Sequence, residues 1–190
     1  MAYEDEILKK LANSDNWPSF ERPDYLTDLN LLADNSFDTK TIEGYLASVL
    51  IYQQLTEEFI RILIECSTFY IQLKVFPQEF QNRSLKKKMF GQLIQELTLS
   101  VIDENIRQLA ELANDLNNTR IQIVHKLTKN DTINQISEQC ESVKATFDKI
   151  WELFDDVYDN YQVTFKDFRK DIDDFKDLIG NYEDNDKIEE

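Results

Sequence analysis

Glycine and proline are nearly absent from this sequence. The 190 residues contain three of each, whereas average usage would give roughly 13 glycines and 10 prolines. Tight turns depend on these residues, and β-sheets, barrels and glycine-rich phosphate-binding loops depend on tight turns. The shortage therefore argues against those architectures. It predicts an all-α fold, an up-and-down helical bundle built on long antiparallel helices.

Cysteine and histidine are also scarce. Cys66 and Cys140 lie far apart in apolar stretches, and His125 is the single histidine. Two cysteines and one histidine are too few for an ordinary zinc site. Isolated cysteines of this kind are typical of free buried thiols in a reducing compartment. We therefore expect no metal and no cofactor.

Long uncharged apolar runs are missing as well. The most apolar stretch, residues 59–76, is interrupted by Arg61, Glu65 and Lys74, which argues against a membrane span. The first ten residues, MAYEDEILKK, are acidic and lack the apolar core of a signal peptide. These features predict a cytoplasmic protein with no membrane partner.

Positive charge is in short supply, but it is unevenly distributed. The chain has 37 acidic and 21 basic side chains, a net charge of −16. So acidic a protein is not expected to bind nucleic acid along its whole surface. Residues 81–130, in contrast, carry eight basic and five acidic side chains. A local RNA site would therefore lie in that segment.

The sequence is rich in helical periodicity. Apolar residues recur at steps of three and four along most of the chain. The spacing predicts helices over residues 4–13, 24–33, 38–75, about 84–100, 103–128 and from 131 onward. Ser84 and Asp131 are candidate N-caps, and Pro77 marks the end of the long early helix. After Tyr161 the apolar pattern slips before it resumes at Phe165, which predicts a kink or a separate final helix.

One of these apolar faces carries an arginine. On a helical wheel centred on Arg120, the apolar residues of 106–127 fall within an arc of about 180°. His125 lies about 140° from Arg120, at the border between the apolar face and solvent. Burying an unpaired guanidinium costs several kcal/mol. One interpretation is therefore structural: Arg120 extends its guanidinium to solvent or pairs with a core carboxylate such as Glu65 or Glu58. The other is that Arg120 belongs to a functional site with His125.

Several polar neighbours could support such a site. Asn117, one turn before Arg120, can orient the guanidinium or bind phosphate; alternatively, it is a helix-capping residue. Nearby lysines can hold an RNA backbone or can simply form a solvated face. These lysines are Lys86, Lys87, Lys88, Lys126 and Lys129. The first three open the expected fourth helix, where the helix dipole disfavours positive charge.

The segment LNNTRIQIVHKL, residues 116–127, resembles the signature of the HEPN superfamily of helical-bundle ribonucleases. That signature is an Arg followed four to six residues later by a His, near the start of a late helix. Apolar residues usually precede the His, as Ile123 and Val124 do here. The similarity in helical arrangement covers roughly residues 40–160.

The resemblance implies a metal-independent endoribonuclease that acts in phage defence or as a toxin. His125 would transfer protons while the ribose 2′-OH attacks the adjacent phosphate. Arg120 would neutralise the charge that builds on the phosphoryl oxygens. Because one histidine cannot be both acid and base in a single turnover, a homodimer would share one composite site. The other implied partners are an RNA substrate and an antitoxin or defence-system protein.

The breakers and the apolar pattern divide the chain. Residues 1–37 are expected to form short helices that pack on the body, with Trp17 folding back onto it, and residues 38–162 are expected to form the HEPN-like bundle. Residues 163–182 would form a C-terminal helix. Residues 183–190 are expected to be a disordered tail because they are short, polar and terminal.

Two other classes of function stay open at this point. The first is a non-catalytic helical interaction or regulatory protein, such as a degenerate HEPN relative. The acidic surface favours it, as does Ile121, where the family often has a small polar residue after the Arg. The second is an acidic nucleic-acid mimic that blocks a DNA-binding enzyme. It would bind a basic protein tightly and would give His125 no role.

Overall fold

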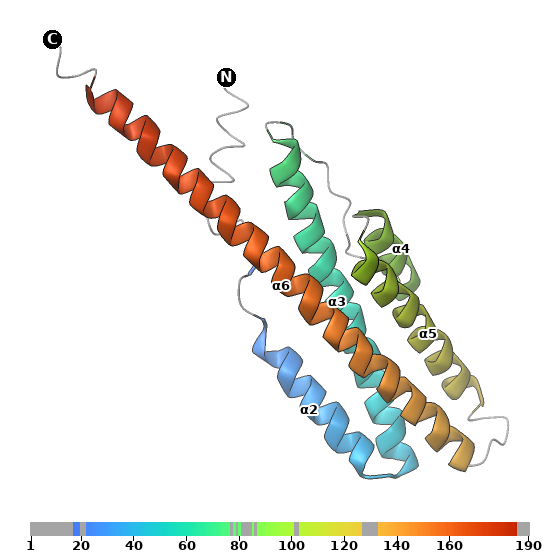
Figure 1. The fold of residues 1–190 in the computed structure, drawn as a ribbon. Helices are drawn as coiled ribbons and strands as arrows, with labels where there is room; N and C mark the ends of the chain where they lie inside the picture. Colours follow the sequence, from blue (N-terminus) through green and yellow to red (C-terminus); the bar gives the residue numbers. More distant parts are fainter. Residues whose placement is uncertain are drawn as a thin grey trace.

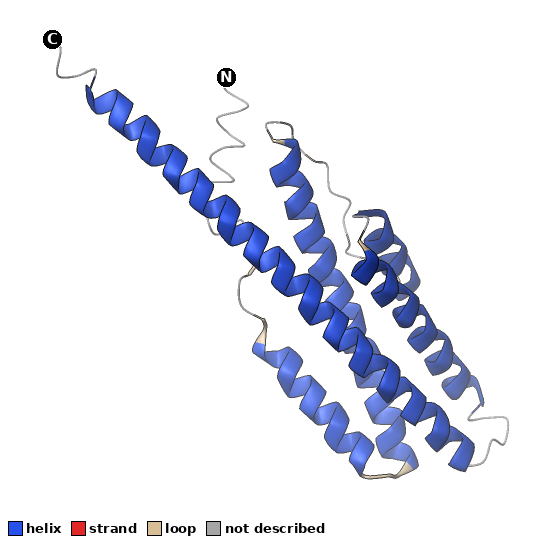
Figure 2. Ribbon diagram, viewed as in Figure 1, coloured by secondary structure: helices blue, strands red, loops and turns tan. Residues whose placement is uncertain are grey.

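The computed structural model describes most of the chain. It describes residues 17–19, 22–76, 78, 80, 85, 87–100, 103–126 and 133–185, with side chains of the last segment as far as Lys170. Lys126 and Ile133 are described by their backbone alone. The regular secondary structure of these residues is helical, joined by turns and loops, with no β-strand (Figure 2). The predicted all-α bundle is confirmed.

The helices pack side by side as an elongated bundle (Figure 1). They are α2 (Asp24–Asp38), α3 (Ile42–Val75), α4 (Phe90–Ser100), α5 (Glu104–Lys126) and α6 (Ile133–Asn185). As predicted, α3 ends just before Pro77 and α4 ends at Ser100. Asp103 caps α5 by accepting a hydrogen bond from the Ile106 N–H at 3.0 Å. The expected helix over 4–13 and the caps at Ser84 and Asp131 lie outside the described residues.

The boundary between α2 and α3 differs from the prediction of one helix starting near residue 38. The chain reverses at Lys40, whose φ of 54° lies in the left-handed region. Thr41 then caps α3, because its Oγ1 accepts a hydrogen bond from the Gly44 N–H at 3.1 Å. A Cβ on Gly44 would lie 2.3 Å from the Ser36 carbonyl oxygen. Glycine therefore permits the close approach of α2 to the first turn of α3.

The fourth helix is shorter than predicted. α4 begins at Phe90 rather than near Ser84, and Lys87 and Lys88 lie in a turn before it. The side chain of Gln92 stabilises this start, since its Oε1 accepts a hydrogen bond from the Met89 N–H at 3.0 Å. Starting the helix after the lysines also keeps their charges away from its first turn, where the dipole would disfavour them.

The two longest helices, α3 and α6, run parallel to each other. Their paired residues keep an almost constant offset in number, between 92 and 96, along the whole contact. These pairs are Tyr45–Ser137, Tyr52–Phe147, Phe59–Phe154, Ser67–Tyr161 and Phe69–Phe165. The antiparallel packing expected for the long helices instead occurs between α2 and α3 and between α5 and α6 (Figure 1). Parallel helices need a long connection, which α4 and α5 supply.

Aromatic rings fill the contact between α3 and α6. Phe59 stacks on Phe154 with ring centroids 4.2 Å apart and on Phe147 at 6.0 Å. Tyr52 stacks on the other side of Phe147 at 4.5 Å. The predicted seam of the final helix is therefore confirmed as core. Cys66 and Cys140 are also buried as free thiols.

The separate C-terminal helix expected over residues 163–182 is wrong. α6 continues without interruption to Asn185, although the apolar pattern slips after Tyr161. Both Tyr161 and Phe165 are buried, so the helix continues through the slip in the apolar pattern without losing contact with the core. Trp17 packs against Phe165 and Phe69, which confirms that it folds back onto the body. The first three residues of the expected disordered tail belong to α6, and residues 186–190 lie outside the described chain.

The aromatic stack gives a direct test of this core. Replacing Phe59 by Ala removes a ring with no solvent exposure and should lower the free energy of unfolding by about 3–5 kcal/mol. The control, Leu99→Ala, truncates a side chain that is 80% exposed and should change stability by less than about 0.5 kcal/mol. Urea unfolding followed by circular dichroism measures both. Equal effects of the two substitutions would contradict this packing.

Candidate functional site

α5 presents a regular apolar seam to the rest of the bundle. The residues of this seam recur at alternating steps of three and four, with one polar interruption. Its buried members are Ile106, Leu109, Ala113, Leu116 and Ile123, and Ala110 beside them is also buried. Arg120 occupies the step between Leu116 and Ile123. The arginine therefore stands where the packing pattern calls for an apolar side chain.

Arg120 lies in this seam with an unsatisfied donor. The residue is half-buried, and its Nε is buried with no hydrogen-bond partner in the described structure. The ion pair considered from the sequence is wrong, because neither Glu58 nor Glu65 pairs with Arg120. Glu58 instead accepts a hydrogen bond from the Tyr25 hydroxyl at 2.6 Å. Both glutamates line a cavity beside Pro18 and Pro23 rather than the α5 seam.

An unsatisfied buried donor is costly. Leaving such a group without a partner costs about 1–3 kcal/mol, and a buried polar atom without a partner needs a specific explanation. Packing does not provide one, since an aliphatic residue at position 120 would continue the seam. A ligand or a second protein surface would supply acceptors for the guanidinium.

His125 lies on the last turn of α5 with an exposed side chain, as the helical wheel predicted. Five residues of helix separate it from Arg120 by about 7.5 Å along the axis and about 140° around it. Arg120 is half-buried at a seam position of α5, whereas His125 is exposed. A single α5 helix thus displays the two side chains in different directions.

The apolar face around Arg120 is only partly covered. Ile121 is 37% exposed and Val124 is 45% exposed, although both were expected on the buried face. Ala110 lies on nearly the same side of α5 as Ile121 yet is 2% exposed. The difference follows from the length of α4, whose 11 residues cover only the first half of the 23-residue α5. Beyond the end of that hairpin the strip stays open.

The other predicted site residues fall into two groups. Asn117 is half-buried inside α5, nine residues before its end, so it is not a helix cap and remains one turn from Arg120. Lys126 is the last residue of α5. Lys87 is exposed, while Lys88 forms an ion pair with Glu96. The remaining two lysines, Lys86 and Lys129, lie outside the described residues.

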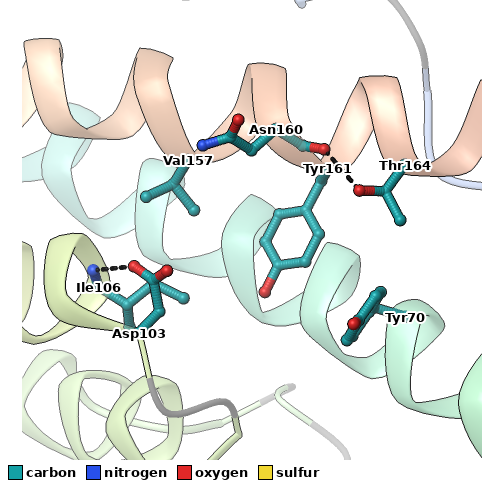
Figure 3. A pocket seen from close by; sticks show the side chains of 7 residues that line it. All are labelled: Tyr70, Asp103, Ile106, Val157, Asn160, Tyr161 and Thr164. Atoms are coloured by element: carbon teal, nitrogen blue, oxygen red, sulfur yellow. Dashed lines mark hydrogen bonds between the residues drawn. The ribbon is translucent and has the colours of Figure 1, made fainter.

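The register of α5 against α6 fixes the height of Arg120 in the bundle. Ile106 lines a pocket together with Val157 and Tyr161 (Figure 3). Arg120 comes 14 residues after Ile106 on α5. Because α5 and α6 are antiparallel, the α6 residue beside Arg120 is about 14 residues before Val157, which is close to Val143. The constant offset between α6 and α3 then puts Arg120 at the height of Ser48 on α3.

The structure does not bring the lysine run to this height. The amide groups of Lys87 and Lys88 both contact the Leu85 carbonyl, which also accepts a hydrogen bond from Arg61 of α3. Arg61 lies about 20 Å further along the bundle than Ser48. The described lysines of the run are therefore too far from Arg120 to share its site.

No protein-family model, curated protein or solved structure matches this chain. None of the described helices is long and apolar enough to cross a membrane. Within the described residues, no group of three or more His, Cys, Asp or Glu side chains is placed to hold a metal ion. The site is therefore argued from the geometry of α5 and from the sequence motif.

Because Arg120 has an unpaired buried donor, we expect that replacing it with an apolar residue increases the free energy of unfolding. Replacing Arg120 by Leu removes the unpaired donor and completes the seam, and should raise the free energy of unfolding by about 1–2 kcal/mol. The control is Arg107→Leu, which removes an exposed α5 arginine paired with Glu104 and Glu111 and should not stabilise. Chemical unfolding of both variants measures the difference. Destabilisation by Arg120→Leu would show that the guanidinium is structural.

Proposed function

We propose that this protein is a metal-independent endoribonuclease of the HEPN type, which acts in phage defence or as a toxin. The observation that carries the proposal is Arg120, a guanidinium in the α5 seam with a buried, unpartnered Nε. A residue that costs stability without contributing to packing is typical of a functional position. Its spacing to His125 on the same helix is the spacing of the HEPN signature.

The two side chains supply complementary chemistry. The imidazole of His125 in one copy accepts the proton of the ribose 2′-OH, and the protonated His125 of a second copy donates a proton to the leaving oxygen. The guanidinium of Arg120 donates hydrogen bonds to the phosphoryl oxygens, whose charge increases in the transition state. Asn117, one turn earlier on α5, is positioned to orient that guanidinium. The reaction needs no metal ion in this scheme.

A homodimer completes the site. Arg120 and His125 leave α5 in different directions, so a second copy related by two-fold symmetry can oppose the histidine of one chain to the arginine of the other. Exposed apolar residues mark the surface for this contact. Ile121 and Val124 lie beside both motif residues and stay uncovered by α4. Two histidines in one cleft would also separate the acid and base roles.

The nuclease activity is tested with the purified protein and a mixed pool of cellular RNA in EDTA. His125→Ala and Arg120→Leu should each lower the cleavage rate by at least about a hundredfold, since general acid–base catalysis and charge stabilisation each contribute about that much. Arg107→Leu should retain the native rate, because Arg107 is exposed and paired with two glutamates. Gel electrophoresis of 5′-labelled RNA measures the rates.

Cleavage that survives in both variants would come from a contaminant and would overturn the proposal. Absence of cleavage in the dimeric native protein would favour the second candidate, a non-catalytic interaction protein. The exposed Ile121 supports that candidate, because an apolar side chain next to the motif suits protein contact better than RNA contact.

The dimer makes a separate prediction. Val124→Glu puts a charge in the open strip and should convert a dimer to a monomer, with loss of RNA cleavage and unchanged helicity. Val163→Glu is the matched control, because Val163 is 59% exposed on α6, far from the motif. Light scattering after size exclusion measures the mass. A Val124→Glu protein that stays dimeric and active would place the dimer contact elsewhere.

A further inference from the structure

The C-terminal part of α6 projects beyond the end of the bundle (Figure 1). The helices that pack along α6 are α3 and α5. Lys74, at the end of α3, lies over the Phe168 ring at 5.0 Å, and Asp103, just before α5, lines a pocket with Thr164. From about residue 169 to its end at residue 185, about 24 Å further along the axis, α6 runs beside no other described helix.

The apolar stripe of α6 continues into this projecting part of the sequence. Phe165 is fully buried, and Phe168 packs partly buried against the core. The next three apolar positions of the pattern follow at steps of four, three and four, which keeps them on the same face of an α-helix. They are Ile172, Phe175 and Ile179, and we call them the terminal stripe. Such a stripe on a helix without neighbours is a contact surface for another element.

The described residues before α2 contact α6 in antiparallel order. As residue numbers fall from 22 to 17, the contacts move toward the C-terminal end of α6. These contacts are the ion pair Arg22–Asp155, the hydrogen bond from the Tyr158 hydroxyl to the Ser19 carbonyl at 2.8 Å, and the ring contact Trp17–Phe165 at 6.3 Å. Trp17 also packs on Phe69, close to the end of α3, at 4.8 Å. The chain before Trp17 therefore starts where the projecting part of α6 begins.

The segment before Trp17 has the pattern of a short amphipathic helix. The sequence predicts a helix over residues 4–13, and Ile7, Leu8 and Leu11 share one face of it. Ten helical residues are about 15 Å long, so this helix fits along the projecting part of α6. The three residues that join it to Trp17 span at most about 11 Å. Its length and its starting point thus put the terminal stripe within reach.

We propose that residues 4–13 form a helix that packs antiparallel on the terminal stripe of the same chain. The face of Ile7, Leu8 and Leu11 covers the stripe as α3 covers the earlier part of α6. Trp17, which is 9% exposed between the two helices, anchors the segment to the body. The contact lies at the opposite end of the bundle from His125 and does not depend on the proposed nuclease function.

Hydrogen exchange of the full chain, followed by mass spectrometry of peptides, tests this contact. Amides of residues 172–182 should be protected in the native protein, because an uncovered helix end opens readily. Leu8→Asp/Leu11→Asp removes two apolar side chains from the contact and should lower that protection at least about tenfold. Protection of residues 147–161, in the aromatic core, should stay unchanged and shows that the bundle is folded.

The matched control is Asn13→Asp/Asn16→Asp, which adds the same charge to the same segment but leaves its apolar residues in place. It should keep the native protection of residues 172–182. The protection should also be the same at low and at high protein concentration, because the contact is within one chain.

Three results would overturn the proposal. Rapid exchange of residues 172–182 in the native protein would show that nothing covers the terminal stripe. Protection that survives Leu8→Asp/Leu11→Asp and rises with protein concentration would assign the stripe to a second copy of the chain. Equal loss of protection in both double variants would show an effect of charge rather than of apolar contact.

Discussion

The stacked aromatic contact between α3 and α6 determines the rest of this structure. Tyr52, Phe59, Phe147 and Phe154 interleave at centroid distances of 4.2 to 6.0 Å and fix the two longest helices in parallel. When two consecutive long helices are parallel, the segment that connects them must run in the opposite direction along the bundle. In this chain that segment contains α4 and α5, and α5 is therefore antiparallel to α6 (Figure 1). This topology places Arg120, in the second half of α5, near the end of the bundle where α3 and α6 begin.

The unequal lengths of α4 and α5 create the candidate site. An 11-residue α4 beside a 23-residue α5 covers Ala110 but leaves Ile121 and Val124 open. Apolar exposure and the unpartnered guanidinium therefore occur on the same half of one helix. A short helix beside a long one costs buried area in the monomer, and the area left open is where a second surface can pack. The candidate site and the proposed dimer contact would thus have a common structural origin.

Sequence periodicity predicted the helices but not how they face one another. The steps of three and four located the cores of α3, α5 and α6 because helical spacing is a local property. The parallel arrangement of α3 and α6 depends on contacts between residues more than 90 positions apart, such as Ser67 and Tyr161, which no local pattern encodes. The exposure of Val124 likewise depends on where α4 begins. The wheel found Arg120 and the border position of His125, yet it could not show that Glu58 and Glu65 face a different cavity.

The distribution of charge is a further reason to expect that one copy of the chain does not form the whole proposed site. Residues 81–130 form one basic segment in the sequence, but folding places Lys87 and Lys88 at the Leu85 carbonyl bound by Arg61, about 20 Å further along the bundle than the height of Arg120. Glu96 also neutralises Lys88. Among the described residues of the lower half of α5, Arg120 and Lys126 are the basic side-chain positions. One copy therefore offers little attraction for a phosphate backbone on a chain of charge −16. Two copies meeting along the Ile121–Val124 strip would double the positive charge at one place, so the proposed contact that would bring Arg120 and His125 together would also create the positive field that the proposed RNA binding requires.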